Sequence, residues 1–198
     1  MTDNFPWYLS RASGLVGFIL LYVSIFLGLA IRTPILKRII KPVYSFRVHC
    51  WISFQALLFA FFHGAILLLD KFIGFSWQNI FIPFYPTSYS KAVDGDFLAL
   101  GIIGFYLMLL LVATSYGRKY FSLRLWRSVH SMNVALYVVS LIHALYLGTD
   151  LREGALRSVF IYANIFLVVL FLLNLCIKLF LMLYKTDNFF QGDSAIEE

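Results

Sequence analysis

The stretch VHCWISFQALLFAFFHGAILLL, residues 48–69, contains no charged side chain and carries a histidine near each end, His49 and His63. An apolar run of about 20 residues crosses a hydrocarbon core of ~30 Å as one helix. The rest of the chain fits this pattern, because its 198 residues are 61% hydrophobic and 13% charged. A soluble domain is about one quarter charged. We therefore expect an integral membrane protein and exclude soluble enzymes and nucleic-acid-binding modules, although the net charge is +6.

Four further uncharged stretches have a similar length and a strongly apolar interior. They are residues 12–31, 97–117, 128–149 and 158–177. They are apolar on all sides and lack the short alternating segments of a membrane barrel, so helices are favoured. The predicted fold is an all-α integral membrane bundle of five transmembrane helices. We expect residues 1–185 to form this transmembrane domain and residues 186–198 to form a short polar cytoplasmic tail.

Residues 72–90 are also uncharged, but Pro83 and Pro86 and several polar residues make a sixth span unfavourable. A helix broken there would expose unpaired backbone groups to lipid. We expect an interfacial or re-entrant loop instead. Three aromatic side chains suit the level of the lipid headgroups: Trp77, Tyr85 and Tyr89.

The distribution of basic residues predicts the orientation of the five spans. Two connections contain basic residues and no acid, and these residues are Arg32, Lys37, Arg38, Lys41 and Arg47 in the first and Arg118, Lys119, Arg124 and Arg127 in the third. The second and fourth connections balance bases with acids. Basic connections lie in the cytoplasm. We therefore predict a multi-pass protein of the plasma (inner) membrane, with its N-terminus outside and its C-terminus in the cytoplasm.

All four histidines fall in the second and fourth predicted spans, and ionisable residues inside spans are usually functional. His49 and His63 are 14 positions apart, and His130 and His143 are 13 apart. At 1.5 Å per residue, each pair is separated by roughly 20 Å along its helix. The two helices run in the same direction, so His49 and His130 share a depth near the cytoplasm, and His63 and His143 share a depth nearer the outside.

Two imidazoles at one depth on facing helices can fill both axial positions of a haem iron. The pattern predicts two stacked haems between the second and fourth helices. The sequence has no Cys-x-x-Cys-His for covalent attachment, so we expect them to be bound non-covalently. The angular register suits one helix better than the other, because 14 positions return to within roughly 40° of the same face, whereas 13 positions miss it by about 140°. We expect the fourth span to be tilted or distorted, or to address its haems from different sides.

Two alternatives remain open at this point. The histidines can be polar residues that help helices pack in a haem-free membrane anchor. The protein can also be a transporter of a small solute or metal, although its acids lie outside the spans and a metal transporter normally adds carboxylates.

The sequence resembles the transmembrane domain of ferric reductases and NADPH oxidases, and most closely the short bacterial ferric-reductase-like membrane proteins. The resemblance covers about residues 10 to 180. Its motifs are His49-x13-His63, Trp126-Arg127-Ser-Val-His130-x12-His143, Thr114-Ser115-Tyr116, Gly148-Thr149-Asp150, Arg11-Ala-Ser-Gly14-Leu-Val-Gly17 and Ile82-Pro83-Phe84.

This resemblance implies an oxidoreductase subunit in which the four histidines hold two b-type haems and electrons pass from the cytoplasmic side to an acceptor outside. The larger relatives carry a cytoplasmic flavin and NADPH domain, and this chain shows no Gly-rich phosphate loop before Glu198. We therefore expect flavin to act only through a partner. The donor is then a separate flavin reductase or membrane quinol, and the acceptor is a ferric chelate or a periplasmic oxidoreductase.

Basic residues near the histidines are candidate partners of the haem propionates. Arg47 and Arg127 lie two and three positions before His49 and His130, so they can reach the cytoplasmic rim of a haem. Positive-inside anchoring explains both arginines equally well. On the outer side no spacing selects among four candidates, Lys71, Lys91, Arg152 and Arg157. Gly101 and Gly104 can let their helix approach a macrocycle closely, or can serve ordinary helix packing.

Overall fold

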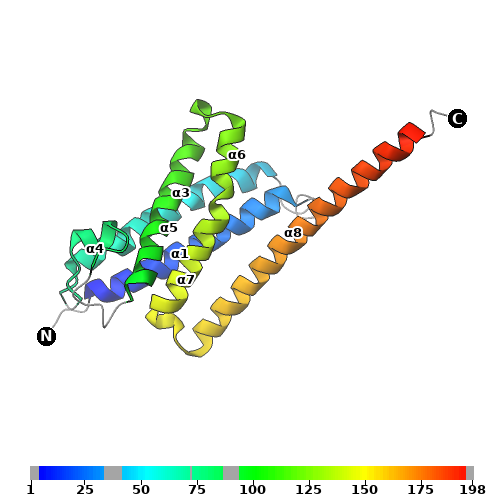
Figure 1. Cartoon of the computed structure of the whole chain (residues 1–198). Coiled ribbons are helices and arrows are strands. Elements are labelled where there is room, and N and C mark those ends of the chain that lie inside the picture. The colour runs from blue at the N-terminus through cyan, green and yellow to red at the C-terminus, as the bar shows by residue number, and fades with distance from the viewer. Residues whose placement is uncertain (1–4, 34–41, 72, 87–93, 195–198) are drawn as a thin grey trace.

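The computed structural model describes residues 5–33, 42–71, 73–86 and 94–194 (Figure 1). These residues form α-helices and short 3-10 turns, with no strand among them. The predicted all-helical class is therefore confirmed for the described part of the chain.

Five helical segments in the described ranges are long and apolar enough to cross a membrane. They comprise α1 (Phe5–Arg32), α3 (Pro42–Ile66) with the turn η1 (Leu67–Leu69), α5 (Gly95–Tyr116), α6 (Leu123–Ser131) followed by α7 (Asn133–Leu147), and α8 (Gly154–Ser194). The short elements are α4 (Trp77–Phe81), η2 (Arg118–Tyr120) and η3 (Thr149–Leu151). All five predicted spans are confirmed, and the protein is a multi-pass membrane protein.

The spanning helices pack as two antiparallel pairs. Helix α1 lies along α3, and α5 lies along α7, with a smaller contact between α3 and α5 (Figure 1). Helices α3 and α7 therefore run in the same direction. This arrangement puts the two histidine-bearing helices on facing sides of the bundle, each supported from behind by a helix of its own pair.

The fourth span is broken between its two histidines. Helix α6 ends at Ser131 and α7 begins at Asn133. At the break the N–H of Met132 donates to the carbonyl of Val129 at 3.0 Å, which is a tight 3-10 turn, and the N–H of Leu136 donates to the carbonyl of Met132 at 2.9 Å. Of the options that the 13-residue spacing leaves open, the structure shows a local distortion of the span between its two histidines.

The segment between α3 and α5 does not cross the membrane in its described part. Its short helix α4 packs with Leu67, Ile73 and Phe75 in a small apolar cluster that also touches Trp7 of α1. Trp77 and Tyr85 are exposed, as expected for aromatic residues at the headgroup level. Tyr89 lies outside the described residues. The segment therefore covers the end of the bundle that holds His63 and His143.

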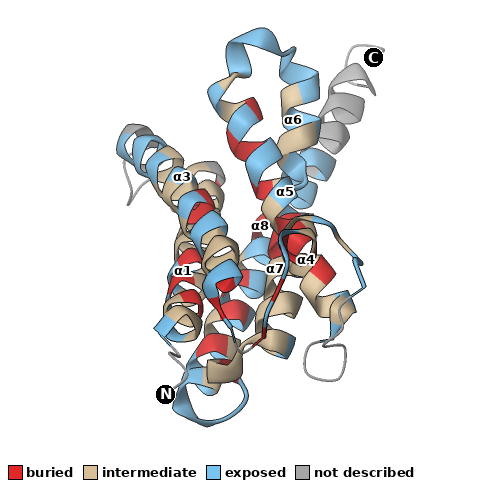
Figure 2. Cartoon of the chain, turned by 90° about the vertical axis from the view of Figure 1, so that its left-hand side faces the viewer, coloured by how far each residue is buried: buried red, intermediate tan, exposed pale blue. Residues whose placement is uncertain are grey.

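A layer of apolar side chains fills the bundle midway between the two histidine depths. Nine buried side chains pack together there, and we call them the middle layer: Leu21, Ala56, Leu57, Met108, Leu111, Val112, Leu136, Tyr137 and Leu167. Figure 2 shows buried residues on the sides of the helices that face one another and exposed residues around the outside. Outward-facing apolar side chains are expected where lipid is the solvent.

Helix α8 leaves the bundle and continues beyond the predicted domain boundary at residue 185 to Ser194 (Figure 1). Polar contacts fix its first half. Tyr137 of α7 donates a hydrogen bond to Asn164, and Tyr22 of α1 donates to the carbonyl of Ala163 at 3.0 Å. Further along, the Asn174 amide donates to the Thr33 hydroxyl at 2.6 Å.

Candidate functional site

The fold brings the four histidines together as two pairs at two depths. The ring centroids of His49 and His130 are 6.4 Å apart, with 73° between the ring planes. Those of His63 and His143 are 6.2 Å apart, with 82° between the planes. We call the first pair the inner level and the second pair the outer level. The pairing is the one that the sequence predicts.

These separations leave room for one metal ion between two imidazoles. Metal–nitrogen bonds to histidine are about 2 Å long, so two rings on opposite sides of one ion have their nitrogens roughly 4 Å apart. Adding about 1.2 Å from each nitrogen to its ring centre gives roughly 6.4 Å between centroids. Both observed distances agree with this value. Among the described residues there is no group of three or more His, Cys, Asp or Glu that could hold a metal ion by itself.

Helix α1 contacts the far side of both α3 histidines. The Nδ1–H of His63 donates to the carbonyl of Ser10 at 2.8 Å, and the Nδ1–H of His49 donates to the carbonyl of Ser24 at 2.8 Å. The same arrangement recurs on the other helix pair, where the Nδ1–H of His143 donates to the carbonyl of Phe97 on α5 at 2.8 Å.

These hydrogen bonds determine the tautomer of three histidines. A carbonyl oxygen only accepts, so the proton of each ring must sit on Nδ1, and Nε2 keeps its lone pair. A metal-binding histidine is usually held in this way by a backbone carbonyl. His49, His63 and His143 therefore each keep a lone pair on Nε2, the atom through which such a histidine can bind a metal.

Glycines create the space for these rings. A Cβ atom added at Gly14 would lie 2.7 Å from Nδ1 of His63, and one added at Gly101 would lie 2.5 Å from Nδ1 of His143. A Cβ at Gly28 would lie 3.5 Å from Cε1 of His49, an ordinary contact. Gly101 thus accommodates a histidine ring, whereas Gly104 faces Ser140 and serves helix packing.

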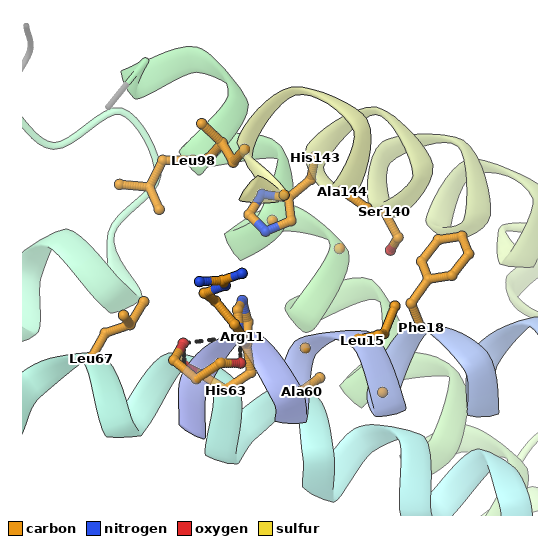
Figure 3. Close-up of a pocket in the computed structure, with 18 of the residues that line it drawn as sticks. Arg11, Leu15, Phe18, Ala60, His63, Leu67, Leu98, Ser140, His143 and Ala144 are labelled. Carbon is orange, nitrogen blue, oxygen red and sulfur yellow. Dashed lines mark hydrogen bonds between the residues drawn. The ribbon is translucent and has the colours of Figure 1, made fainter. Parts of the chain in front are cut away.

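A cavity of about 290 Å³ surrounds the outer level. Figure 3 shows His63 of α3 and His143 of α7 among its lining residues, together with Arg11 of α1. Phe81, at the end of α4, also lines the cavity. The walls are mainly apolar, as expected for a site that holds a largely apolar ligand.

An ion pair ties α1 to η3 at the outer cavity. Arg11 binds both carboxylate oxygens of Asp150, with 2.9 Å between Nε and Oδ2. The hydrogen bond from Arg11 is the main cause that holds the pKa of Asp150 below its ordinary value, and the positive charge adds to it. The Thr149 hydroxyl next to this pair is buried and has no hydrogen-bond partner in the described ranges. It is a donor available to a bound carboxylate.

The inner level has an aromatic support. The indole of Trp126 stacks on the ring of His130, with centroids 4.9 Å apart and 19° between the planes. The Arg118 guanidinium lies 4.9 Å from the centre of the Trp126 ring. The buried indole N–H of Trp126 has no hydrogen-bond partner among the residues described. Like Thr149 at the outer level, it can donate to an anionic group.

The other predicted basic residues lie in different surroundings. Arg47 and Arg127 are exposed on α3 and α6. Arg157 donates to the carbonyls of Leu151 and Arg152, at 2.8 Å and 3.3 Å, which is a structural role at the start of α8. Arg152 lines the outer cavity and Lys71 is exposed, while Lys91 lies outside the described residues.

Sequence reasoning did not assign Arg11, Ser10 or Ser24 to the site. A signal for the serines was present, because Ser10-x3-Gly14 and Ser24-x3-Gly28 are 14 residues apart, the same spacing as His49 and His63. Two antiparallel helices with equal spacings can pair both sets at once. For Arg11 the signal was a single arginine next to an uncharged span.

The fold and site define a multi-pass helical membrane protein with two histidine pairs facing each other across its core. The family model described as the ferric reductase like transmembrane component matches residues 13–141. The chain therefore belongs to this family, which indicates an oxidoreductase that transfers electrons within the membrane. The matched range includes three of the histidines and ends two residues before His143. No curated protein and no solved structure matches the chain.

Proposed function

We propose that this protein carries electrons across the membrane through two b-type haems, one held by His49 and His130 and the other by His63 and His143. The observation that supports this most strongly is the pairing of four histidines at two depths with centroid distances of 6.4 Å and 6.2 Å. Histidines that only helped helices pack in a haem-free anchor would not need the same distance between ring centroids at both levels.

The tautomers of the histidines support the same proposal. The carbonyls of Ser10, Ser24 and Phe97 hold the Nδ1 protons, so each Nε2 lone pair is available. When bound, the haems supply one-electron carriers at two depths. The protein contributes ligands, orientation and an apolar environment, and we assign no catalytic acid, base or nucleophile.

Polar groups at each level suit the carboxylates of a haem. Trp126 offers a buried N–H at the inner level and Thr149 a buried hydroxyl at the outer level. Arg11 and Arg152 line the outer cavity, and Arg47 and Arg127 remain candidates at the inner rim. A buried donor without a protein partner is costly unless something else accepts its hydrogen bond.

We place the electron donor on the cytoplasmic side, where Arg118, Lys119 and Arg124 form an exposed basic connection. The donor is a separate flavin reductase or membrane quinol, so flavin enters only through a partner. The acceptor lies outside and is a ferric chelate or a periplasmic oxidoreductase. The inner membrane location and the cytoplasmic C-terminus follow from the same positive-inside pattern.

The spectrum of the purified protein tests the haem proposal. We expect a reduced-minus-oxidised difference with b-type α and Soret bands, and a pyridine haemochrome ratio of two haems per chain. Both haems should be low-spin and six-coordinate, because each level supplies two ligands. A featureless spectrum would favour the anchor or transporter, and a ratio of one would remove one histidine pair from the proposal.

Reporter fusions test the orientation separately. A reporter active only in the cytoplasm should give signal after Glu198, and a reporter active only outside should give signal when inserted between residues 77 and 91. The reverse pattern would overturn the direction of electron transfer while leaving the haem sites intact.

A further inference from the structure

We propose that α1 tunes the two levels separately, with Ser10 setting the donor strength of His63 and Ser24 setting that of His49. This inference rests on the proposed function, since it concerns histidines that act as haem ligands. It assigns the two serines as positioning residues that act through the ligands.

Each serine contacts its histidine through two oxygens. The Ser10 hydroxyl oxygen lies 3.1 Å from Nδ1 of His63, beside the Ser10 carbonyl at 2.8 Å. The Ser24 hydroxyl oxygen lies 3.2 Å from Nδ1 of His49, beside the Ser24 carbonyl at 2.8 Å. Both Nδ1 protons are therefore shared between a carbonyl and a hydroxyl of one residue.

The hydroxyl protons have other acceptors, so the hydroxyl oxygens must accept from the rings. Ser10 donates its proton to the carbonyl of His63 at 2.9 Å. At the inner level Ser53 donates to the carbonyl of His49 at 2.7 Å, and Ser24 lies 2.6 Å from the Ser53 hydroxyl. Because the proton of Ser53 is already used, Ser24 must donate to Ser53.

An acceptor at Nδ1 changes the electronic character of the ligand. As the proton is drawn toward the acceptor, Nε2 becomes more basic and stabilises the oxidised iron more than the reduced iron. Ser10 and Ser24 are only 2% and 4% exposed, so water does not replace the missing oxygen easily. Removing either hydroxyl should therefore raise the midpoint potential of one haem.

The arrangement of α1 makes the two effects independent. The serines are 14 residues apart on α1, as are the histidines on α3. The middle layer separates the two levels, and neither serine has a hydrogen bond to the histidine of the other level. A single helix thus carries two copies of one contact, each of which acts on one redox level.

The test is a redox titration of the full-length protein, with optical and low-spin EPR detection of both haems. Ser10→Ala should raise the potential of the outer haem and leave the inner haem unchanged, and Ser24→Ala should do the reverse. The EPR signal of the same haem should shift, because it reports ligand donor strength. The variant His143→Ala should keep only the inner haem in its low-spin form, so its optical and EPR signals identify those of the inner haem in the unmodified protein.

Three further variants make the test specific. Ser10→Thr and Ser24→Thr keep a hydroxyl and should restore the potential that the corresponding alanine variant changes. Thr114→Val is the matched control, since it removes a buried hydroxyl that bonds the carbonyl of Leu110 in its own helix. Its two potentials should equal those of the unmodified protein.

The possible failures are distinguishable. Absence of haem from the unmodified protein would end both the proposed function and this inference. Two bound haems with unchanged potentials in both alanine variants would overturn the inference alone. A joint shift of both potentials, or loss of haem at the substituted level, would also overturn it, because the serines would then have a general structural role.

Discussion

The outer and inner levels hold equivalent pairs of histidines by different means. At the outer level Gly14 and Gly101 pack directly against the two rings, and a cavity of about 290 Å³ lies beside them. At the inner level Gly28 leaves a looser contact, and Trp126 stacks on His130. A pair of histidines can therefore be supported by close packing or by an aromatic stack, and we expect the two levels to differ in their tolerance of substitution.

The largest expected effect comes from removing one ligand at a time. His143→Ala should reduce the haem content from two to one per chain or convert the outer haem to high-spin, while the inner haem is still reduced from the cytoplasmic side. External acceptors should receive almost no electrons, because the gap grows by roughly the 20 Å between levels. Stopped-flow absorbance in oriented vesicles measures both events.

His130→Ala is the converse variant at the inner level. It should keep an outer haem that dithionite reduces and the cytoplasmic donor does not. Normal reduction of the external acceptor by either variant would rule out a relay of two levels.

The next largest effect should come from substituting the glycines that contact the histidine rings, and it should differ between the two levels. Gly101→Ala should displace the ring of His143, and Gly14→Ala should displace the ring of His63. We expect each variant to lower the free energy of unfolding by about 1–3 kcal/mol through overpacking. Each variant should also lose the outer haem. Gly28→Ala should retain both haems. Pyridine haemochrome and thermal unfolding give the two readouts.

Gly28→Ala is also the control, because it adds the same methyl group to α1 at the looser contact. Equal losses in Gly14→Ala and Gly28→Ala would contradict the difference in packing between the levels.

A smaller effect should follow from the aromatic support of the inner level. Trp126→Leu removes the stack on His130, and such aromatic contacts contribute about 0.5–1.5 kcal/mol. We expect weaker retention of the inner haem and an unchanged outer haem, measured by haem loss to apomyoglobin. Trp126→Phe keeps an aromatic ring but not the indole N–H, so it should recover the part of the retention that comes from the stack. Faster loss of the outer haem instead would place Trp126 at the wrong level.

The smallest effect concerns the ion pair between Arg11 and Asp150. Because the pKa of Asp150 is lowered in the folded protein, its contribution to stability is present above the ordinary aspartate pKa and is lost as pH falls through the folded pKa. The contribution is about 1 kcal/mol or less, since both side chains are partly exposed. Asp150→Asn should abolish this acid-dependent part in thermal melts between neutral and acid pH. An identical pH profile in the variant would show that the pair does not affect stability.

The sequence predicts the parts of this fold that depend on local composition. The length of the uncharged stretches identifies the spans. The 13-residue spacing of His130 and His143 indicates an irregular fourth span, with a distortion among the options, but not that the break falls at Met132. With five spans the second and fourth helices run in the same direction, so the sequence also predicts which histidines lie at the same depth. These features need no knowledge of which helix packs against which.

The supporting contacts could not be predicted in the same way, because they depend on tertiary pairing. Ser10 contacts a histidine 53 positions away, and Arg11 contacts Asp150 at a separation of 139 positions. Either residue taken alone is typical of a helix end near a membrane surface. Only the pairing of α1 with α3 and its approach to η3 distinguishes these roles.

The middle layer has an electrical consequence. Its buried members are Leu21, Ala56, Leu57, Met108, Leu111, Val112, Leu136, Tyr137 and Leu167, with no acid, lysine, arginine or histidine among these described residues. The one hydroxyl of the layer, that of Tyr137, donates its proton to Asn164. The layer offers no carboxylate, amine or imidazole to take up a proton when an electron crosses it, so the proposed transfer moves net charge. Each electron that leaves a negative cytoplasm gains about 2.3 kcal/mol per 100 mV of membrane potential. The voltage across the membrane then acts as part of the driving force, and the rate of acceptor reduction depends on whether the membrane is energised.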